Sequence, residues 1–162
     1  MSENKNKTNN EVKKNLSSKR NFILDGKIGE TNVKDIIYGI IDVNNYDLEK
    51  KEDDDIYVAK PINIILNTFG GSLYDSNALI GVIESSETPV HTYCYGKAMS
   101  GGFYIFASGH KRFATQLATF MYHDASVGIH DSIHGFKYTL EHYTELRDRY
   151  DNYMLSVTNL PK

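Results

Sequence analysis

A serine set among glycines is the first candidate for chemistry in this sequence. Ser100 is followed by Gly101 and Gly102, shortly after a segment, residues 90–95, that is predicted to form a strand. A helix that starts at such a point directs unpaired backbone N–H groups outward, and donors of this kind stabilise oxyanions. Ser100 is therefore a candidate nucleophile for acyl transfer. The alternative for a lone serine near glycines is a small helix-capping residue.

A serine hydroxyl is a weak nucleophile, and it needs a base to activate it. His123 ends another predicted strand, residues 119–123, where an imidazole can face a cleft. The chain contains six histidines, and residue chemistry alone does not select His123 among them, because a single histidine is more often a surface or core residue.

A second glycine turn has the same relation to a strand. Residues 62–66 form a mostly apolar run, typical of a strand buried on both faces. Residues 67–71 (Asn-Thr-Phe-Gly-Gly) are predicted to form a turn, which is followed by a helix over residues 72–84. Glycines at such turns allow a second chain to approach closely. A backbone donor on this turn can therefore act together with one beside Ser100.

A metal site is the alternative use for the histidines. His130, His134 and His142, with Asp131, have spacings that a helix face can bring together, but Gly135 disfavours a helix there and no matching acidic or cysteine cluster accompanies them. We therefore expect no metal and no cofactor.

The elements that must position these groups alternate between strands and helices. Residues 22–24 are a short apolar strand candidate, and Thr31 is a candidate cap for a helix bearing apolar residues at helical spacing up to Ile41. The acidic stretch 49–55 is predicted to be a solvated loop. Residues 112–114 are a further short strand. Alternation of this kind predicts an α/β domain with a largely parallel sheet.

A long helix is predicted over residues 137–157. Its apolar residues recur at spacings of three and four along one stripe and are Leu140, Tyr143, Leu146, Tyr150, Tyr153 and Val157. Such a stripe covers a core or docks a neighbouring subunit. Ahead of the whole domain, residues 21–162, the polar residues 1–20 are predicted to be a flexible arm.

Composition excludes several classes of partner. The chain has 162 residues, 40% of them hydrophobic, a net charge of -3 and no basic face of the kind that binds nucleic acid. No apolar run is long enough to span a membrane, and the N-terminal residues lack the apolar centre of a secretory leader. The single cysteine, Cys94, cannot form an internal disulfide, which suits a reducing, cytoplasmic compartment.

The ordered set of motifs resembles the ClpP family of serine proteases. The resemblance extends from Ile62 to about Leu160 and rests on residues 67–71, on residues 96–102 (Gly-Lys-Ala-Met-Ser-Gly-Gly) and on residues 121–123 (Met-Tyr-His). In the family these correspond to an Asn-Ser-Pro-Gly-Gly turn, a Gly-x-Ala-x-Ser-x-Gly elbow and a Met-x-His strand end. The implied fold is a ClpP/crotonase-like stack of βα units with a protruding helical handle.

The resemblance also implies roles for residues and an assembly. Ser100 would attack a peptide carbonyl, His123 would transfer the proton, and the backbone N–H groups of Gly71 and Gly101 would form the oxyanion hole. The subunits would form heptameric rings, stacked as a tetradecamer with the active sites inside. Short peptides would be hydrolysed without ATP, whereas folded proteins would need an ATP-driven unfoldase as a partner.

Some positions depart from the family pattern. Phe69 replaces the proline of the turn, Gly101 replaces the usual methionine, and the polar arm lacks the hydrophobic axial-loop pattern by which an unfoldase would dock. No residue matches the third catalytic residue, an aspartate beyond the long helix, so the protease domain is expected to be truncated. Asp124 and Asp131 follow His123, but no motif gives either of them that role.

Three other functions remain open at the level of sequence. The Ser-Gly-Gly run is similar to the signal-peptide-peptidase A family, whose Ser-Lys pair would need a lysine such as Lys97, although Lys97 lies within the elbow itself. A crotonase-like acyl-CoA enzyme would leave Ser100 and His123 unexplained. A pseudo-subunit that acts only in ring assembly is favoured by the missing aspartate and opposed by the retained Ser100 and His123.

Overall fold

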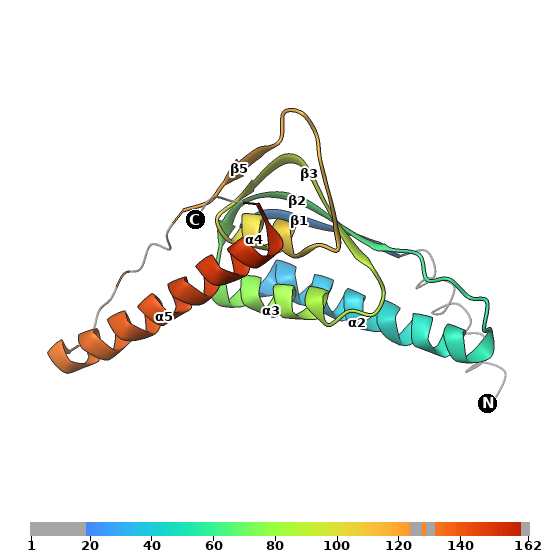
Figure 1. The fold of residues 1–162 in the computed structure, drawn as a ribbon, viewed down its shortest axis with the longest axis horizontal. Helices are drawn as coiled ribbons and strands as arrows, with labels where there is room; N and C mark the ends of the chain where they lie inside the picture. The colour runs from blue at the N-terminus through green and yellow to red at the C-terminus, as the bar shows by residue number, and fades with distance from the viewer. Residues whose placement is uncertain (1–18, 124–127, 129–131, 160–162) are drawn as a thin grey trace. The chain divides into compact units, whose positions relative to one another are not determined.

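The computed structural model describes residues 19–123, 128 and 132–159 (Figure 1). The chain divides into two compact units, Met1–Met121 and Tyr122–Lys162. Of the predicted polar arm, residues 1–18 lie outside the described residues. Arg20, which the sequence assigns to the arm, is 6% exposed and belongs to the packed part of the first unit. Among the described residues, no helix has the length and apolar character needed to cross a membrane.

The first unit is an α/β domain built on a parallel sheet. Its elements are β1 (Asn21–Ile28), α2 (Glu30–Asp53), β2 (Ile62–Gly71), α3 (Leu73–Glu84), β3 (Val90–Met99), α4 (Gly101–Ser108), β4 (Lys111–Ala114) and β5 (Thr119–Met121). The strand order is β1-β2-β3-β4, β5 pairs with the last residues of β3, and every pairing is parallel. The predicted α/β class with a parallel sheet is therefore confirmed.

The sheet buries one face more deeply than the other. Alternate residues of β2, from Ile62 to Gly70, are buried, whereas those between them are half-buried and Phe69 is exposed. Since successive side chains of a strand point to opposite faces, this alternation matches a sheet covered by helices on one side (Figure 1). The prediction that this strand is buried on both faces is wrong for its second face.

Helix α2 differs from its prediction at both ends. It begins at Glu30 after Gly29, whose N–H donates to Asn32 Oδ1 at 3.1 Å, so Thr31 lies inside the helix and does not cap it. It also continues to Asp53, through most of the acidic stretch predicted as a loop. Lys50 and Lys51 lie in the last turn, where positive charge complements the helix dipole.

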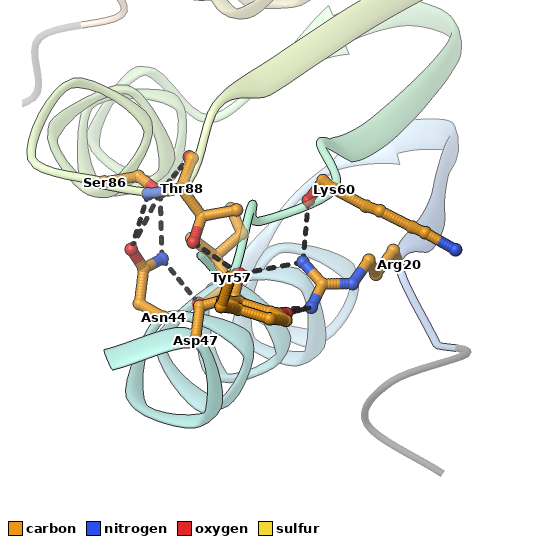
Figure 2. A network of polar contacts seen from close by, with 8 residues as sticks. Arg20, Asn44, Asp47, Tyr57, Lys60, Ser86 and Thr88 are labelled. Atoms are coloured by element: carbon orange, nitrogen blue, oxygen red, sulfur yellow. Dashed lines mark hydrogen bonds and ion pairs between the residues drawn. The ribbon is translucent and has the colours of Figure 1, made fainter. Parts of the chain in front are cut away.

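A buried ion pair anchors the start of β1 to this helix (Figure 2). Arg20 donates from Nη1 to Asp47 Oδ2 at 2.8 Å and from Nη2 to Asp47 Oδ1 at 2.5 Å. The side chains are 7% and 2% exposed. Arg20 Nη1 also donates to the carbonyl oxygen of Lys60 at 2.7 Å. The guanidinium thus ties the segment before β1, the helix and the segment before β2 to one another.

Further hydrogen bonds satisfy the buried carboxylate. The hydroxyls of Tyr57 and Thr88 each donate to Asp47 at 2.7 Å. Burial by itself would raise the pKa of Asp47, but the hydrogen bonds from Arg20, Tyr57 and Thr88 outweigh it and the pKa is lowered. Burial and the bond to Asp47 raise the pKa of Tyr57 to about 12. Asn44, one turn earlier in the helix, joins the network to the α3–β3 connection through the Thr88 N–H at 3.0 Å.

The second unit contains helix α5, Ile133–Val157. It begins four residues earlier than predicted, because the Ser132 side chain caps it by accepting from the Gly135 N–H at 3.1 Å. Of the predicted apolar stripe, Leu146 and Tyr150 are buried, whereas Leu140 is exposed. The long helix is therefore confirmed, while its role as a handle stays a prediction.

Removing the buried guanidinium is expected to destabilise the first unit strongly. Arg20→Met leaves the Asp47 carboxylate buried without its ion-pair partner, which typically costs about 3–5 kcal/mol. Lys50→Met is the matched control, because Lys50 pairs with Asp53 at 3.8 Å on the surface and exposed pairs are worth about 0–1 kcal/mol. Urea unfolding measures both, and equal losses in the two variants would contradict a structural role for the buried pair.

The contribution of Thr88 should depend on pH. Thr88→Val removes a hydrogen bond to a carboxylate, at a cost of about 1.5–3 kcal/mol at neutral pH. Because the native pKa of Asp47 is below its ordinary value of 3.8, this contribution is present above that value and is lost as pH falls through the native pKa. Unfolding free energies measured at several pH values should show the two proteins converging in acid. The exposed control Thr31→Val should show no such convergence.

Candidate active site

Ser100 occupies a strained turn between β3 and α4. It has φ 52° and ψ -125°, and it is the one non-glycine residue with positive φ in the described part of the chain. A side chain is rarely found in this region of backbone space. Strand β3 ends at Met99 and α4 begins at Gly101, so a single residue reverses the chain direction. This is the strand–turn–helix context in which a nucleophilic serine is exposed at the edge of a sheet.

Strand β5 holds the turn from one side. The Ser100 N–H donates to the Met121 carbonyl oxygen at 2.8 Å, and the Ser100 carbonyl accepts from the Phe103 N–H at 2.9 Å. The rings of Phe103 and Phe106 lie 5.6 Å and 4.7 Å from the ring of Phe120. The backbone of Ser100 is thus fixed by a strand and by the first turn of its own helix.

Glycines are required where β2 and α3 approach the turn. A Cβ on Gly70 would lie 2.6 Å from the Met99 carbonyl oxygen and 2.7 Å from Ser100 Cβ, and one on Gly101 would lie 2.5 Å from Ser76 Oγ. Contacts this short cannot be relieved by a small movement of backbone. The glycine-rich motifs therefore allow the end of β2 to lie directly against Ser100.

The backbone donors near Ser100 differ in their availability. The Gly70 N–H donates to Thr68 Oγ1 at 2.9 Å, so it is already used within β2. Thr68 in turn donates to the Gly26 carbonyl oxygen. Gly71, the next residue, is exposed, and Gly101 is the first residue of α4, where N–H groups lack acceptors within the helix. These are the two predicted oxyanion donors, and their role stays a prediction.

His123 lies in the second unit, two residues after the end of β5, and is exposed. Ser100 belongs to the first unit, and the pairing of His123 with Ser100 stays a prediction. Asp124 and Asp131, the acidic residues nearest to His123 in sequence, lie outside the described residues. Beside His123, the Tyr122 hydroxyl donates to the Asp151 carboxylate on α5, a contact that the sequence did not predict.

The Lys97 side chain contacts two residues of β2. Its Nζ atom lies 3.3 Å from Asn67 Oδ1 and 4.3 Å from the centroid of the Phe69 ring. A Ser-Lys mechanism needs an amine that reaches the serine hydroxyl, and these two contacts engage the ammonium elsewhere. The meeting of Lys97 with Asn67 and Phe69 could not be predicted from the sequence, because a bulge shifts the register of β3 against β2 between Leu66 and Thr68.

The candidate metal ligands lie only partly within the described residues. His134 and His142 lie on α5, whereas His130 and Asp131 lie outside the described residues. Within residues 19–123 and 132–159, no group of three or more histidine, cysteine or acidic side chains could hold a metal ion.

The strain at Ser100 can be measured by comparing two substitutions. Ser100→Ala keeps a Cβ in the unfavourable region, whereas Ser100→Gly removes it. We expect the glycine variant to be more stable than the alanine variant by about 1 kcal/mol, since strain relief exceeds the entropy that glycine adds to the unfolded chain. Urea unfolding of both variants measures the difference. An alanine variant more stable than the glycine variant by the full entropy difference, about 0.4–1 kcal/mol, would show that the turn is not strained.

A family model, described as Clp protease, matches residues 4–162. The match includes both glycine turns, Ser100 and His123.

Proposed function

The chain belongs to the Clp protease family, and from that premise we propose that it is a serine endopeptidase subunit with Ser100 as nucleophile and His123 as general base. Family membership supports a ClpP-type peptidase in general. The residue assignments rest on the strained turn at Ser100, which is the observation that carries the proposal, because strain at this single half-buried serine has no evident structural use.

Chain connectivity supports the choice of His123. The Ser100 N–H donates to the Met121 carbonyl oxygen, and His123 is two residues further along. An extended chain of two residues spans at most about 7 Å. The hydrogen bond and the short connection together limit how far the backbone of His123 can lie from Ser100, and this limit follows from chain connectivity and not from the arrangement of the two units.

In the proposed reaction, Ser100 Oγ attacks the peptide carbonyl while His123 accepts its proton. The Gly71 and Gly101 N–H groups stabilise the oxyanion of the tetrahedral intermediate. Collapse of that intermediate expels the amine, which receives the proton from His123 and leaves an acyl-enzyme on Ser100. Water, deprotonated by His123, then releases the second product. The residue that orients His123 is unassigned.

Assembly and partners form the second part of the proposal. Clp proteases typically form oligomeric rings, and we propose heptameric rings stacked in pairs through α5, with an ATP-driven unfoldase supplying folded substrates. The exposed aromatic side chains of α5, Phe136 and Tyr138, are suited to such a contact. A cytoplasmic location is proposed on the buried free thiol of Cys94.

A fluorophosphonate probe tests the catalytic assignment. The protein should be labelled at Ser100, and Ser100→Ala should abolish labelling. His123→Ala should slow labelling by about 10²–10⁴-fold, the usual contribution of a general base. His134→Ala is the matched control, because His134 is also an exposed histidine of the second unit, and it should label at the wild-type rate.

Two outcomes would contradict this assignment. Protein that is folded and oligomeric but never labels would be a pseudo-subunit. Labelling that survives His123→Ala and is lost on replacing a lysine would indicate a Ser-Lys protease.

A further inference from the structure

Four side chains form a connected cluster at the carboxyl ends of the first three strands. Asp25 on β1 accepts at Oδ1 from Asn67 Nδ2 on β2 at 2.9 Å. Asn67 Oδ1 in turn lies 3.3 Å from Lys97 Nζ on β3, and that ammonium lies 4.3 Å from the Phe69 ring centroid. We call these residues, Asp25, Asn67, Phe69 and Lys97, the strand-end cluster.

The amide of Asn67 has its orientation fixed within this cluster. Its NH₂ group faces a carboxylate acceptor and its oxygen faces an ammonium donor, so exchanging the two ends would break both interactions. A Cβ on Gly96 would lie 2.7 Å from the same oxygen, which shows how closely the amide packs on β3. Asn67 therefore holds the Lys97 ammonium in a defined place.

The last member of the cluster, Phe69, is a largely exposed side chain. Phe69 is 69% exposed, yet it directly precedes Gly70 and Gly71. Two successive glycines have the greatest backbone freedom, so the conformation of this turn depends on its neighbours. On its buried side, Thr68 binds the Gly70 N–H. On the exposed side of the turn, the Lys97 ammonium lies over the Phe69 ring.

The position of this turn matters because Gly70 lies directly against the nucleophile. The place of a Gly70 Cβ is 2.7 Å from Ser100 Cβ and 3.2 Å from the Gly101 nitrogen. A shift of a few tenths of an ångström in the turn would change the distance between its N–H donor and the reacting carbonyl. Oxyanion stabilisation depends strongly on that distance.

We propose that Lys97 is a positioning residue that, through its cation–π contact with Phe69, fixes the Gly70–Gly71 turn beside Ser100. This inference rests on the proposed function. Asn67 and Asp25 orient the ammonium, and Lys97 takes no part in proton transfer. Its effect therefore falls on the stabilisation of the tetrahedral intermediate and not on substrate binding in the ground state.

Three variants and a control test the role of Lys97. Lys97→Met keeps most of the stem and removes the charge, Lys97→Arg keeps a cation for the ring, and Phe69→Leu removes the ring. Lys27→Met is the control, because Lys27 pairs in register with Gly70 on the neighbouring strand and its substitution removes the same charge close to the same turn. For each variant, kcat and KM are measured on a short peptide, together with inhibition by a peptide boronate that mimics the tetrahedral intermediate.

We expect Lys97→Met and Phe69→Leu each to lower kcat by about 3- to 30-fold, with KM changed by less than about 2-fold. Boronate affinity should fall by the same factor as kcat/KM. Lys97→Arg and Lys27→Met should stay within about 2-fold of wild type. A double variant that combines Lys97→Met with Phe69→Leu should lose little more than either single variant, since both substitutions break the same contact. Should Lys97→Met fail to fold, Phe69→Leu carries the same test.

Several results would overturn the inference, and they differ from those that overturn the proposed function. If the wild-type protein never reacts at Ser100, both the proposed function and this inference are wrong. If the wild-type protein reacts but Lys97→Met and Phe69→Leu retain full kcat and boronate affinity, only this inference is wrong. Loss of fluorophosphonate labelling in both Lys97→Met and Lys97→Arg, with a changed pH profile, would make Lys97 the base.

Discussion

The close approach of the carboxyl ends of β2 and β3 is the constraint on which the rest of the site depends. Gly70 has no Cβ, so its backbone lies where a side chain would meet Met99 and Ser100. Ser100 itself is held with positive φ by a hydrogen bond to β5 and by the start of α4. A parallel sheet brings the carboxyl ends of neighbouring strands to one edge, and this edge is where α/β proteins commonly place their chemistry.

The strain at Ser100 needs a rigid surrounding structure, and the first unit has two sources of rigidity. The sheet buries one face against helices, and along β2 every second residue from Ile62 to Gly70 is buried. At the opposite ends of the strands, the Arg20–Asp47 pair joins the start of β1 to α2, and Thr88 joins the same carboxylate to the connection before β3. The network therefore fixes where β1 and β3 start, and the glycine contacts fix where β2 and β3 end.

The strand-end cluster shows how one chain can differ from its family while keeping the same turn. A proline at position 69 would restrict the backbone directly, whereas Phe69 leaves it free. In this chain the ammonium of Lys97, on the neighbouring strand, lies over the Phe69 ring. Asn67 contacts that ammonium and is itself bound to Asp25. Local stiffness in a loop can thus come either from backbone chemistry or from side-chain packing.

The sequence by itself determined the order of strands and helices, the parallel class of the sheet and the two glycine turns, because periodicity and glycine placement are local properties of the chain. It also predicted Ser100 as the residue of the turn. It was wrong about Thr31 and about residues 49–55, where charge suggested a loop. Only the tertiary structure decided that Arg20 is buried on Asp47, since this pairing joins residues that are far apart along the chain. The meeting of Lys97 with Phe69 was likewise decided in three dimensions, because a bulge in β3 sets the register that brings them together.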